Sequence, residues 1–96
     1  MKIISNKHFE QMEIMCRNFE ERSKNNLLFL PQHKVSKKIN SLIRSIEKPT
    51  DLELNTIADL VKNIENIEHY GGSAWHDYKI HVNAILKENG FKFNII

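Results

Sequence analysis

The side chains with the greatest chemical capacity are concentrated between Glu68 and His81. This stretch contains three of the five histidines, both tyrosines, the only tryptophan and the only Gly-Gly pair of the 96-residue chain. Imidazole rings can act as general bases or as metal ligands, and aromatic side chains beside a turn commonly anchor protein interfaces. A functional site is therefore expected in or near this stretch.

Metal binding would require ligands from this stretch to reach one point. Two ligands on one helix face need a spacing of three or four residues, but His76 and His81 are five apart and point about 140° away from each other. Only Asp77 and His81 have a suitable offset. One carboxylate and one imidazole form half a site at most, so we expect no metal ion and no cofactor.

Nucleophilic catalysis would require a reactive side chain with a base beside it. Cys16 falls on the apolar face of a predicted helix, where a buried thiol is inert, and Ser73 has no base at a fixed helical offset. The position of Ser73 after two glycines instead predicts a helix N-cap. We therefore expect no catalytic residue and no enzymatic activity.

Part of the stretch has a structural explanation and part has none. Gly71, Gly72 and Ser73 are expected to end one helix and start the next, while Trp75 and Tyr78 fall on an apolar helix face. The remaining polar and aromatic residues are predicted to form a protein-binding surface, made of His69, Tyr70, His76, Asp77 and His81.

The elements that carry these residues follow from the spacing of apolar side chains, whose period predicts four amphipathic helices. The first begins at Ser5 or Asn6 and runs to about Lys24, with an apolar face of Phe9, Met12, Met15, Cys16 and Phe19. The other three are expected at about 34–47, from 51 to 71 or 72, and at about 73–89.

The clearest local signal is the sequence Thr-Asp-Leu-Glu from Thr50 to Glu53. A Thr hydroxyl can accept the proton of the amide three residues later, while the Glu side chain reaches back to the Thr amide. Asp51 adds a negative charge at the positive end of the helix dipole. This capping box predicts that the third helix begins at about Asp51.

Two segments have apolar patterns that are too short for an amphipathic helix. Leu27 to Leu30, followed by a proline, is interpreted as a buried connector. The alternation of Phe91, Phe93 and Ile95 with polar residues predicts a half-buried strand, which Met1 to Ile4 or Leu27 to Leu30 would have to pair. The predicted fold class is therefore all-α or mostly α, a compact four-helix bundle to which the terminal segments can add a small β-sheet.

Charge is distributed unevenly along the chain. Between residues 31 and 48 five cations stand against one acidic residue, and between 49 and 72 five acidic residues stand against one lysine. The basic face of the second helix is an alternative site that would bind nucleic acid through Lys34, Lys37, Lys38, Arg44 and Lys48. The competing interpretation is that the acidic third helix pairs with part of this charge and that solvent covers the rest.

Composition sets the general class of the protein. A chain of 96 residues, 41% hydrophobic and 27% charged, predicts one soluble domain spanning 1–96. A single cysteine, no signal-peptide pattern and no long apolar run indicate a cytoplasmic protein without a membrane span. Abundant Lys, Asn and Ile suggest an AT-rich genome. We therefore expect a small binding protein that regulates or inhibits a protein partner, of a phage or bacterial anti-defence or immunity type.

Overall fold

The computed structural model contains four α-helices within the residues that it describes. The backbone is described for 6–46, 49–62, 67–93 and 95, and the side chains for the same residues except Asn6 and 67–73. The elements in chain order are α1 (Asn6–Asn25), the 3-10 turn η1 (Leu27–Phe29), α2 (Leu30–Ser45), α3 (Asp51–Lys62) and α4 (Ile67–Glu88). The predicted all-α helical bundle is confirmed.

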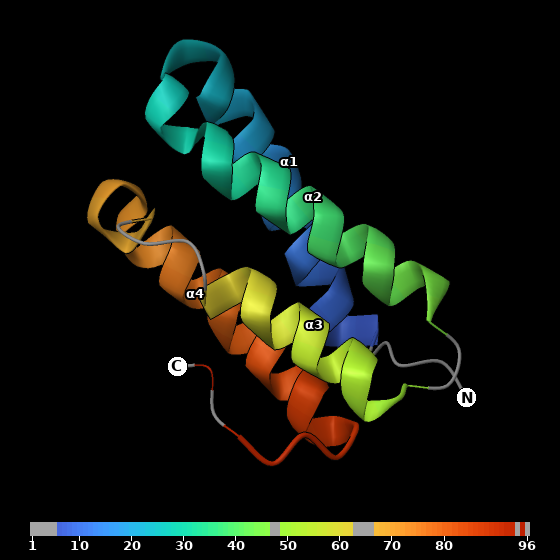
Figure 1. Ribbon diagram of the computed structural model, residues 1–96. Helices are drawn as coiled ribbons and strands as arrows, with labels where there is room; N and C mark the ends of the chain where they lie inside the picture. The colour runs from blue at the N-terminus through green and yellow to red at the C-terminus, as the bar shows by residue number, and fades with distance from the viewer. Residues whose placement is uncertain (1–5, 47–48, 63–66, 94, 96) are drawn as a thin grey trace.

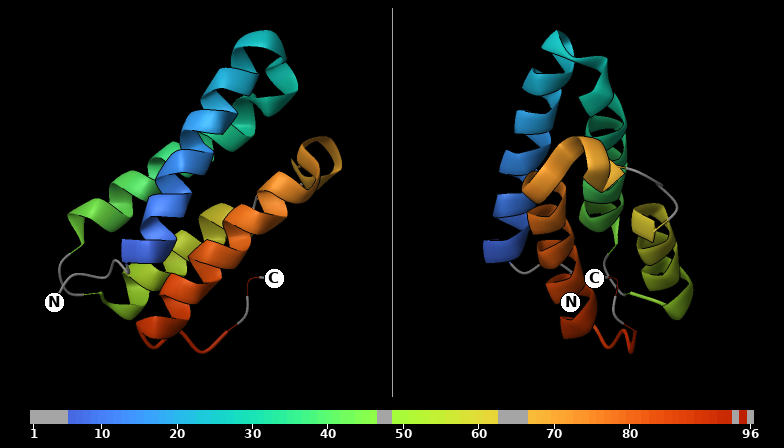
Figure 2. Two further views of the ribbon diagram at one scale, coloured as in Figure 1. Left: turned by 180° about the vertical axis from the view of Figure 1, so that it is seen from behind. Right: turned by 90° about the vertical axis from the view of Figure 1, so that its left-hand side faces the viewer.

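The helices run alternately up and down the bundle (Figure 1). α1 and α2 form an antiparallel hairpin whose tip is η1, and α4 packs against both of them and against η1. α3 packs on α2 beside this group of three (Figure 2). The tip of the hairpin and the start of α3 consequently lie at opposite ends of the molecule in all three views.

The core is built from the apolar faces that the sequence predicts. Phe9, Met12 and Phe19 of α1 are buried, whereas Met15 and Cys16 are half-buried. Completely buried in α4 are Trp75 and Tyr78, which the sequence places on an apolar face, and three further residues of the same helix; together these are Trp75, Tyr78, Val82, Ile85 and Leu86. Ile39 and Ile43 contribute from α2, and Leu54, Ile57, Ala58 and Val61 from α3.

The capping box at the start of α3 is confirmed. The backbone N–H of Glu53 donates to the hydroxyl of Thr50 at 3.2 Å, and the backbone N–H of Thr50 donates to the Glu53 carboxylate at 3.1 Å. Two amides that the helix itself cannot satisfy are thereby satisfied by side chains. The helix begins at Asp51, as predicted.

The predicted helix boundary at Gly71, Gly72 and Ser73 is wrong. α3 ends at Lys62 and α4 already begins at Ile67, so these three residues lie inside α4. Glycine weakens a helix by about 1 kcal/mol relative to alanine but does not forbid one.

The interpretation of Leu27 to Leu30 as a buried connector is also wrong. The segment forms η1 and the first residue of α2, and Leu27 and Leu28 are exposed. Pro31 lies in the first turn of α2, where a missing N–H costs no helical hydrogen bond. The second helix therefore begins four residues earlier than the predicted residue 34.

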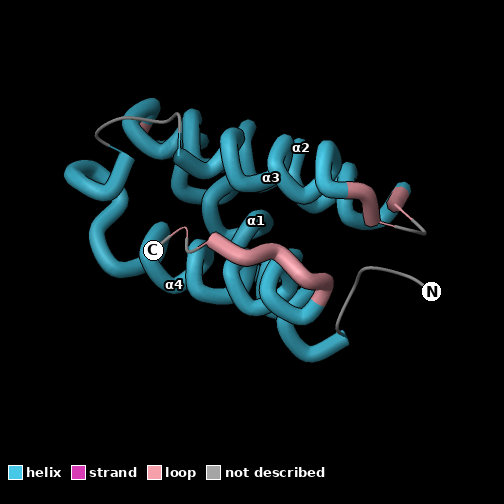
Figure 3. The backbone as a smooth tube through the Cα atoms, turned by 60° about the horizontal axis from the view of Figure 1, so that its bottom comes forward, coloured by secondary structure: helices cyan, strands magenta, loops and turns pink. Residues whose placement is uncertain are grey.

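The C-terminal strand is not formed in the described residues (Figure 3). The chain reverses after α4 through Gly90, whose φ of 89° suits glycine, and the N–H of Phe91 donates to the carbonyl of Leu86 at 3.0 Å. Phe91 and Ile95 are buried while Phe93 is exposed, so these three residues do not share the one buried face that the predicted alternation required. A strand is not built there because Leu27 to Leu30 is helical and offers no edge, while Met1 to Ile4 lies outside the described residues.

Candidate functional site

An aromatic cluster fixes α4 against α1. Trp75 and Tyr78 stack with ring centroids 5.1 Å apart, and the Phe19 ring lies 5.9 Å from Trp75 and 6.1 Å from Tyr78. All three side chains are at most 1% exposed. The residues of α1 and α4 that flank this cluster are therefore held by a rigid core.

A buried polar contact joins the same helices to α2. The Tyr78 hydroxyl donates to Oδ1 of Asn40 at 2.7 Å, and Nδ2 of Asn40 donates to the backbone carbonyl of Met12 at 3.1 Å. Burial raises the pKa of Tyr78 well above its usual range, so the hydroxyl remains a donor. One side chain of α2 thus ties α1 and α4 together.

A hollow of about 100 Å³ opens between α1 and α4 above the aromatic cluster. The lining residues come from both helices and are Met15, Asn18, Phe19, Arg22, Ala74 and Asp77. Arg22 and Asp77 are exposed at its rim and carry opposite charges. The hollow therefore combines a partly apolar wall with one cation and one anion.

Arg22 links the hollow to the tip of the α1–α2 hairpin. The guanidinium of Arg22, which lines the hollow, also lies 5.8 Å from the centroid of the Phe29 ring in η1. Beside Phe29, Leu27 is 77% exposed and Leu28 is 50% exposed. The side chain of Asn26 accepts the N–H of Leu28 at 3.0 Å and fixes this turn. We call Leu27, Leu28, Phe29 and the lining of the hollow the tip–hollow surface.

A histidine pair lies on the same α1–α4 seam. The Nδ1 atoms of His8 and His81 are 3.0 Å apart, and Nε2 of His8 is 3.9 Å from the Glu88 carboxylate. The pKa of His81 is lowered by burial and by the proximity of His8, while Asp77 acts in the opposite direction. The sequence does not indicate this pair, because 73 positions separate the two histidines.

The residues of the predicted protein-binding surface are separated in the structure. Asp77 lines the hollow and His81 faces α1, while His76 is exposed on α4. His69 and Tyr70 belong to the first turns of α4, and their side chains lie outside the described residues. Of the five predicted residues, Asp77 and His81 therefore lie between α1 and α4. Arg22 and the exposed Leu27 and Leu28 belong to the candidate site as well, although the sequence analysis does not predict them.

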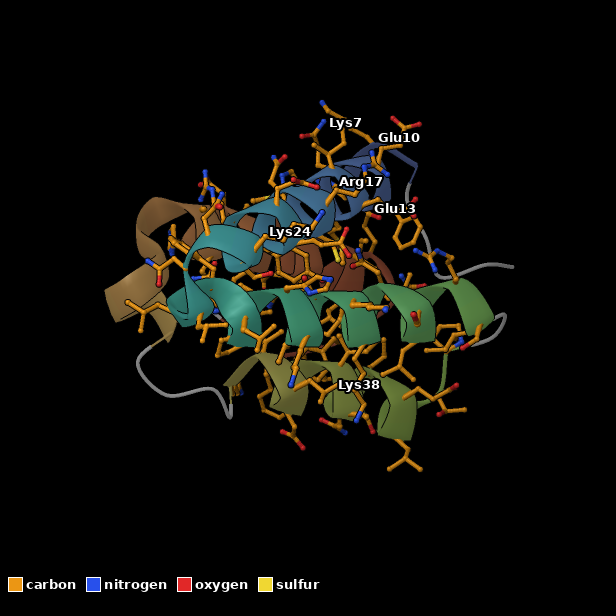
Figure 4. All side chains as sticks on the ribbon, turned by 90° about the horizontal axis from the view of Figure 1, so that it is seen from above. Lys7, Glu10, Glu13, Arg17, Lys24 and Lys38 are labelled. Atoms are coloured by element: carbon orange, nitrogen blue, oxygen red, sulfur yellow. The ribbon has the colours of Figure 1, made fainter. Side chains whose placement is uncertain are left out.

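The predicted basic face divides into residues with and without ionic partners. Arg44 forms an ion pair with Glu13 of α1 at 2.9 Å, and its guanidinium lies 5.7 Å from the Phe9 ring. Lys34, Lys37 and Lys38 are exposed, and no residue of the described chain forms an ion pair with them. Figure 4 shows Lys38 on the side of α2 that faces α3, away from the charged face of α1. Lys48 lies outside the described residues.

A second hollow, of about 190 Å³, lies between the start of α3 and the C-terminal tail. Asp51 and Asn55 line one side, and Gly90 to Phe93 line the other. Phe93 is 64% exposed and packs edge-on against Phe91, with ring centroids 5.6 Å apart. The walls therefore combine the polar side chains of Asp51 and Asn55 with the tail, which contributes Lys92 and two phenylalanines.

Neither a metal site nor a membrane-spanning helix is found in the part of the chain that the structure describes. Within the described residues, no three His, Cys, Asp or Glu side chains are placed to hold a metal ion, and no helix has the length and hydropathy of a membrane span. The chain matches no protein-family model, no curated protein and no solved structure.

Proposed function

We propose that this protein is a small non-enzymatic binding protein that regulates or inhibits another protein by docking through the tip–hollow surface. The observation that supports this proposal is that Arg22 lines the hollow between α1 and α4 and also lies over Phe29, in the turn that carries two exposed leucines. Covering a leucine side chain completely stabilises a complex by about 1.5–3 kcal/mol. Leu27 and Leu28 together therefore offer much of the free energy that a specific complex needs.

The shape and charge of the surface indicate the chemistry of the partner. The hollow of about 100 Å³ suits one aliphatic side chain. Arg22 and Asp77 at the rim favour an acidic and a basic residue on either side of that aliphatic residue. The expected partner is a protein segment with an apolar anchor between two opposite charges.

Co-purification from a lysate of the native host tests the proposal. The bait proteins are the wild type, Leu27→Asp/Leu28→Asp, and Lys34→Gln/Lys37→Gln/Lys38→Gln, each checked for folding by circular dichroism. We expect one protein to be captured by the wild type and by the lysine variant, and to be lost with the leucine variant. Equal capture by all three baits would remove the proposal.

Nucleic-acid binding is the second candidate function. The competing interpretation expected acidic α3 to pair with the basic face of α2. Among the described residues, no ion pair joins α2 to α3. Arg44 of α2 instead forms its ion pair with Glu13 of α1. Lys34, Lys37 and Lys38 are exposed and have no ion-pair partner among the described residues, so they are accessible to phosphate groups.

Three phosphate contacts would give weak binding with a modest salt dependence. For duplex DNA, the logarithm of the binding constant should fall with the logarithm of salt concentration with a slope of about −2.7. A gel-shift titration at several salt concentrations measures this slope for the wild type and for the triple lysine variant. Binding that persists in the variant, or no salt-dependent binding at all, would eliminate this candidate.

A further inference from the structure

The contact between His8 and His81 joins two titratable rings that belong to different helices. Both rings belong to the only side-chain type that ordinarily changes charge between about pH 5 and pH 8. His8 lies in α1 and His81 lies in α4, and the two histidines are 73 positions apart in the sequence. A change of charge at this contact therefore acts directly on how the two helices meet.

The geometry of the contact depends on the number of bound protons. With Nδ1 atoms 3.0 Å apart, one ring donates a hydrogen bond to the other only if the second nitrogen carries no proton. Two bound protons per ring would place two donors and two positive charges against each other. The contact can therefore form when both rings are neutral or when one of them is protonated. It cannot form between two imidazolium rings.

We propose that His8 and His81 form a pH-sensitive clasp that holds α1 against α4 at neutral pH and opens when both rings are protonated. The clasp is a property of the folded chain, so it requires no docking partner.

The charged groups around the pair set the balance. Glu88 of α4 faces the far nitrogen of His8 at 3.9 Å, and Asp77 of α4 acts on His81 through its charge. Both carboxylates favour the first added proton. From α2 and η1, the other elements against which α4 packs, no titratable side chain interacts with the pair in the described part of the chain. At His81, burial and the neighbouring His8 ring outweigh the attraction of Asp77, and a second proton on the pair adds repulsion between two positive charges.

The direction of the pH dependence follows from burial and from the neighbouring ring. The pKa of His81 in the folded protein lies below its ordinary value of 6.5. The unfolded chain then binds a proton more readily than the folded chain, so the stabilisation is complete above 6.5. It is lost progressively as the pH falls from there through the folded pKa.

Histidine titrations by NMR test the clasp directly, because each ring reports its own protonation. The proteins are the wild type, His8→Gln and His81→Gln, and exposed His76 serves as the internal reference. We expect the His81 midpoint to rise in His8→Gln, while the midpoint of His76 stays unchanged. An unchanged His81 midpoint in His8→Gln would overturn the proposal.

Chemical unfolding at about pH 7.5 and about pH 5 gives a second readout. The wild type should lose more stability between these two conditions than His81→Gln, because glutamine can keep a hydrogen bond but cannot gain a charge. His76→Gln is the matched control on the same helix and should lose as much as the wild type. Equal losses in wild type and His81→Gln would also overturn the clasp.

Discussion

Leu27 and Leu52 are equally exposed, at 77% and 76%, but lie at opposite ends of the molecule. Leu27 is followed by a second exposed leucine, and Phe29 of the same turn lies beside Arg22, which lines a hollow with an aromatic wall. Leu52 lies in the first turn of α3 between Asp51 and Glu53, and Glu53 is bound to the helix cap. Exposure of one leucine is ordinary in a soluble protein, whereas apolar groups that adjoin a concave surface indicate a binding site.

The largest expected effect is a loss of affinity for the partner when Leu27 and Leu28 are substituted, compared with no loss when Leu52 is substituted. Once the partner is known, Leu27→Asp/Leu28→Asp should weaken the complex by about 100-fold, since two leucines contribute about 3 kcal/mol. Leu52→Asp is the matched control and should leave the affinity unchanged. Isothermal titration calorimetry measures both. If Leu52→Asp weakens the complex as much as the double variant does, the leucines of the hairpin tip are not the specific contact with the partner.

The second effect concerns the frame beneath the tip–hollow surface. Asn40→Ala removes the acceptor of the Tyr78 hydroxyl and the donor to the Met12 carbonyl. The hydroxyl retains the Ser36 carbonyl at 3.3 Å as a weaker partner, so we expect a loss of about 2 kcal/mol in the free energy of unfolding. Urea denaturation measures it. A change below about 0.5 kcal/mol would show that this contact does not hold the three helices.

The third effect concerns the opposite end of the molecule. Thr50→Ala removes the hydroxyl that accepts the Glu53 amide proton and should reduce the free energy of unfolding by about 1 kcal/mol. Thr50→Ser keeps the hydroxyl and should recover most of this loss. Because α3 lies far from the tip, neither variant should change the affinity for the partner. A weakened complex would place the start of α3 in the interface.

The smallest effect is expected at the rim of the hollow. Asp77 is exposed, and exposed charges contribute about 1 kcal/mol or less to an interaction. Asp77→Asn should therefore weaken the complex by less than about tenfold, with most of the change in the association rate. Surface plasmon resonance at two salt concentrations separates the rates. A loss as large as that of the double leucine variant would make charge, and not the leucines, the main determinant.

The sequence predicted elements well where local chemistry is sufficient to define them. The capping box at Thr50 and Glu53 satisfies two amides by itself, and the glycine at position 90 provides the positive φ that ends α4. Apolar periodicity likewise placed Trp75 and Tyr78 in the core. Gly71 and Gly72 show the limit of such signals, because glycine permits a helix end without requiring one.

The candidate site could be predicted only in part, because it depends on contacts between distant segments. Asp77 was selected from its place in a conspicuous stretch, but nothing local indicates that Arg22 lies across a hollow from it. His8 meets His81 only after α1 and α4 pack together. Leu27 and Leu28 were assigned to the interior because an apolar run before a proline does not reveal whether a turn is covered.

Site-specific photo-crosslinking in the native host tests the docking proposal most directly. A photoreactive phenylalanine analogue is placed at Leu28 in one variant and at Leu52 in another, both of which are exposed side chains. We expect a discrete crosslinked protein of constant mass from position 28 and none from position 52. No adduct at position 28, or the same adduct from both positions, would contradict the assignment of the tip–hollow surface as the docking site.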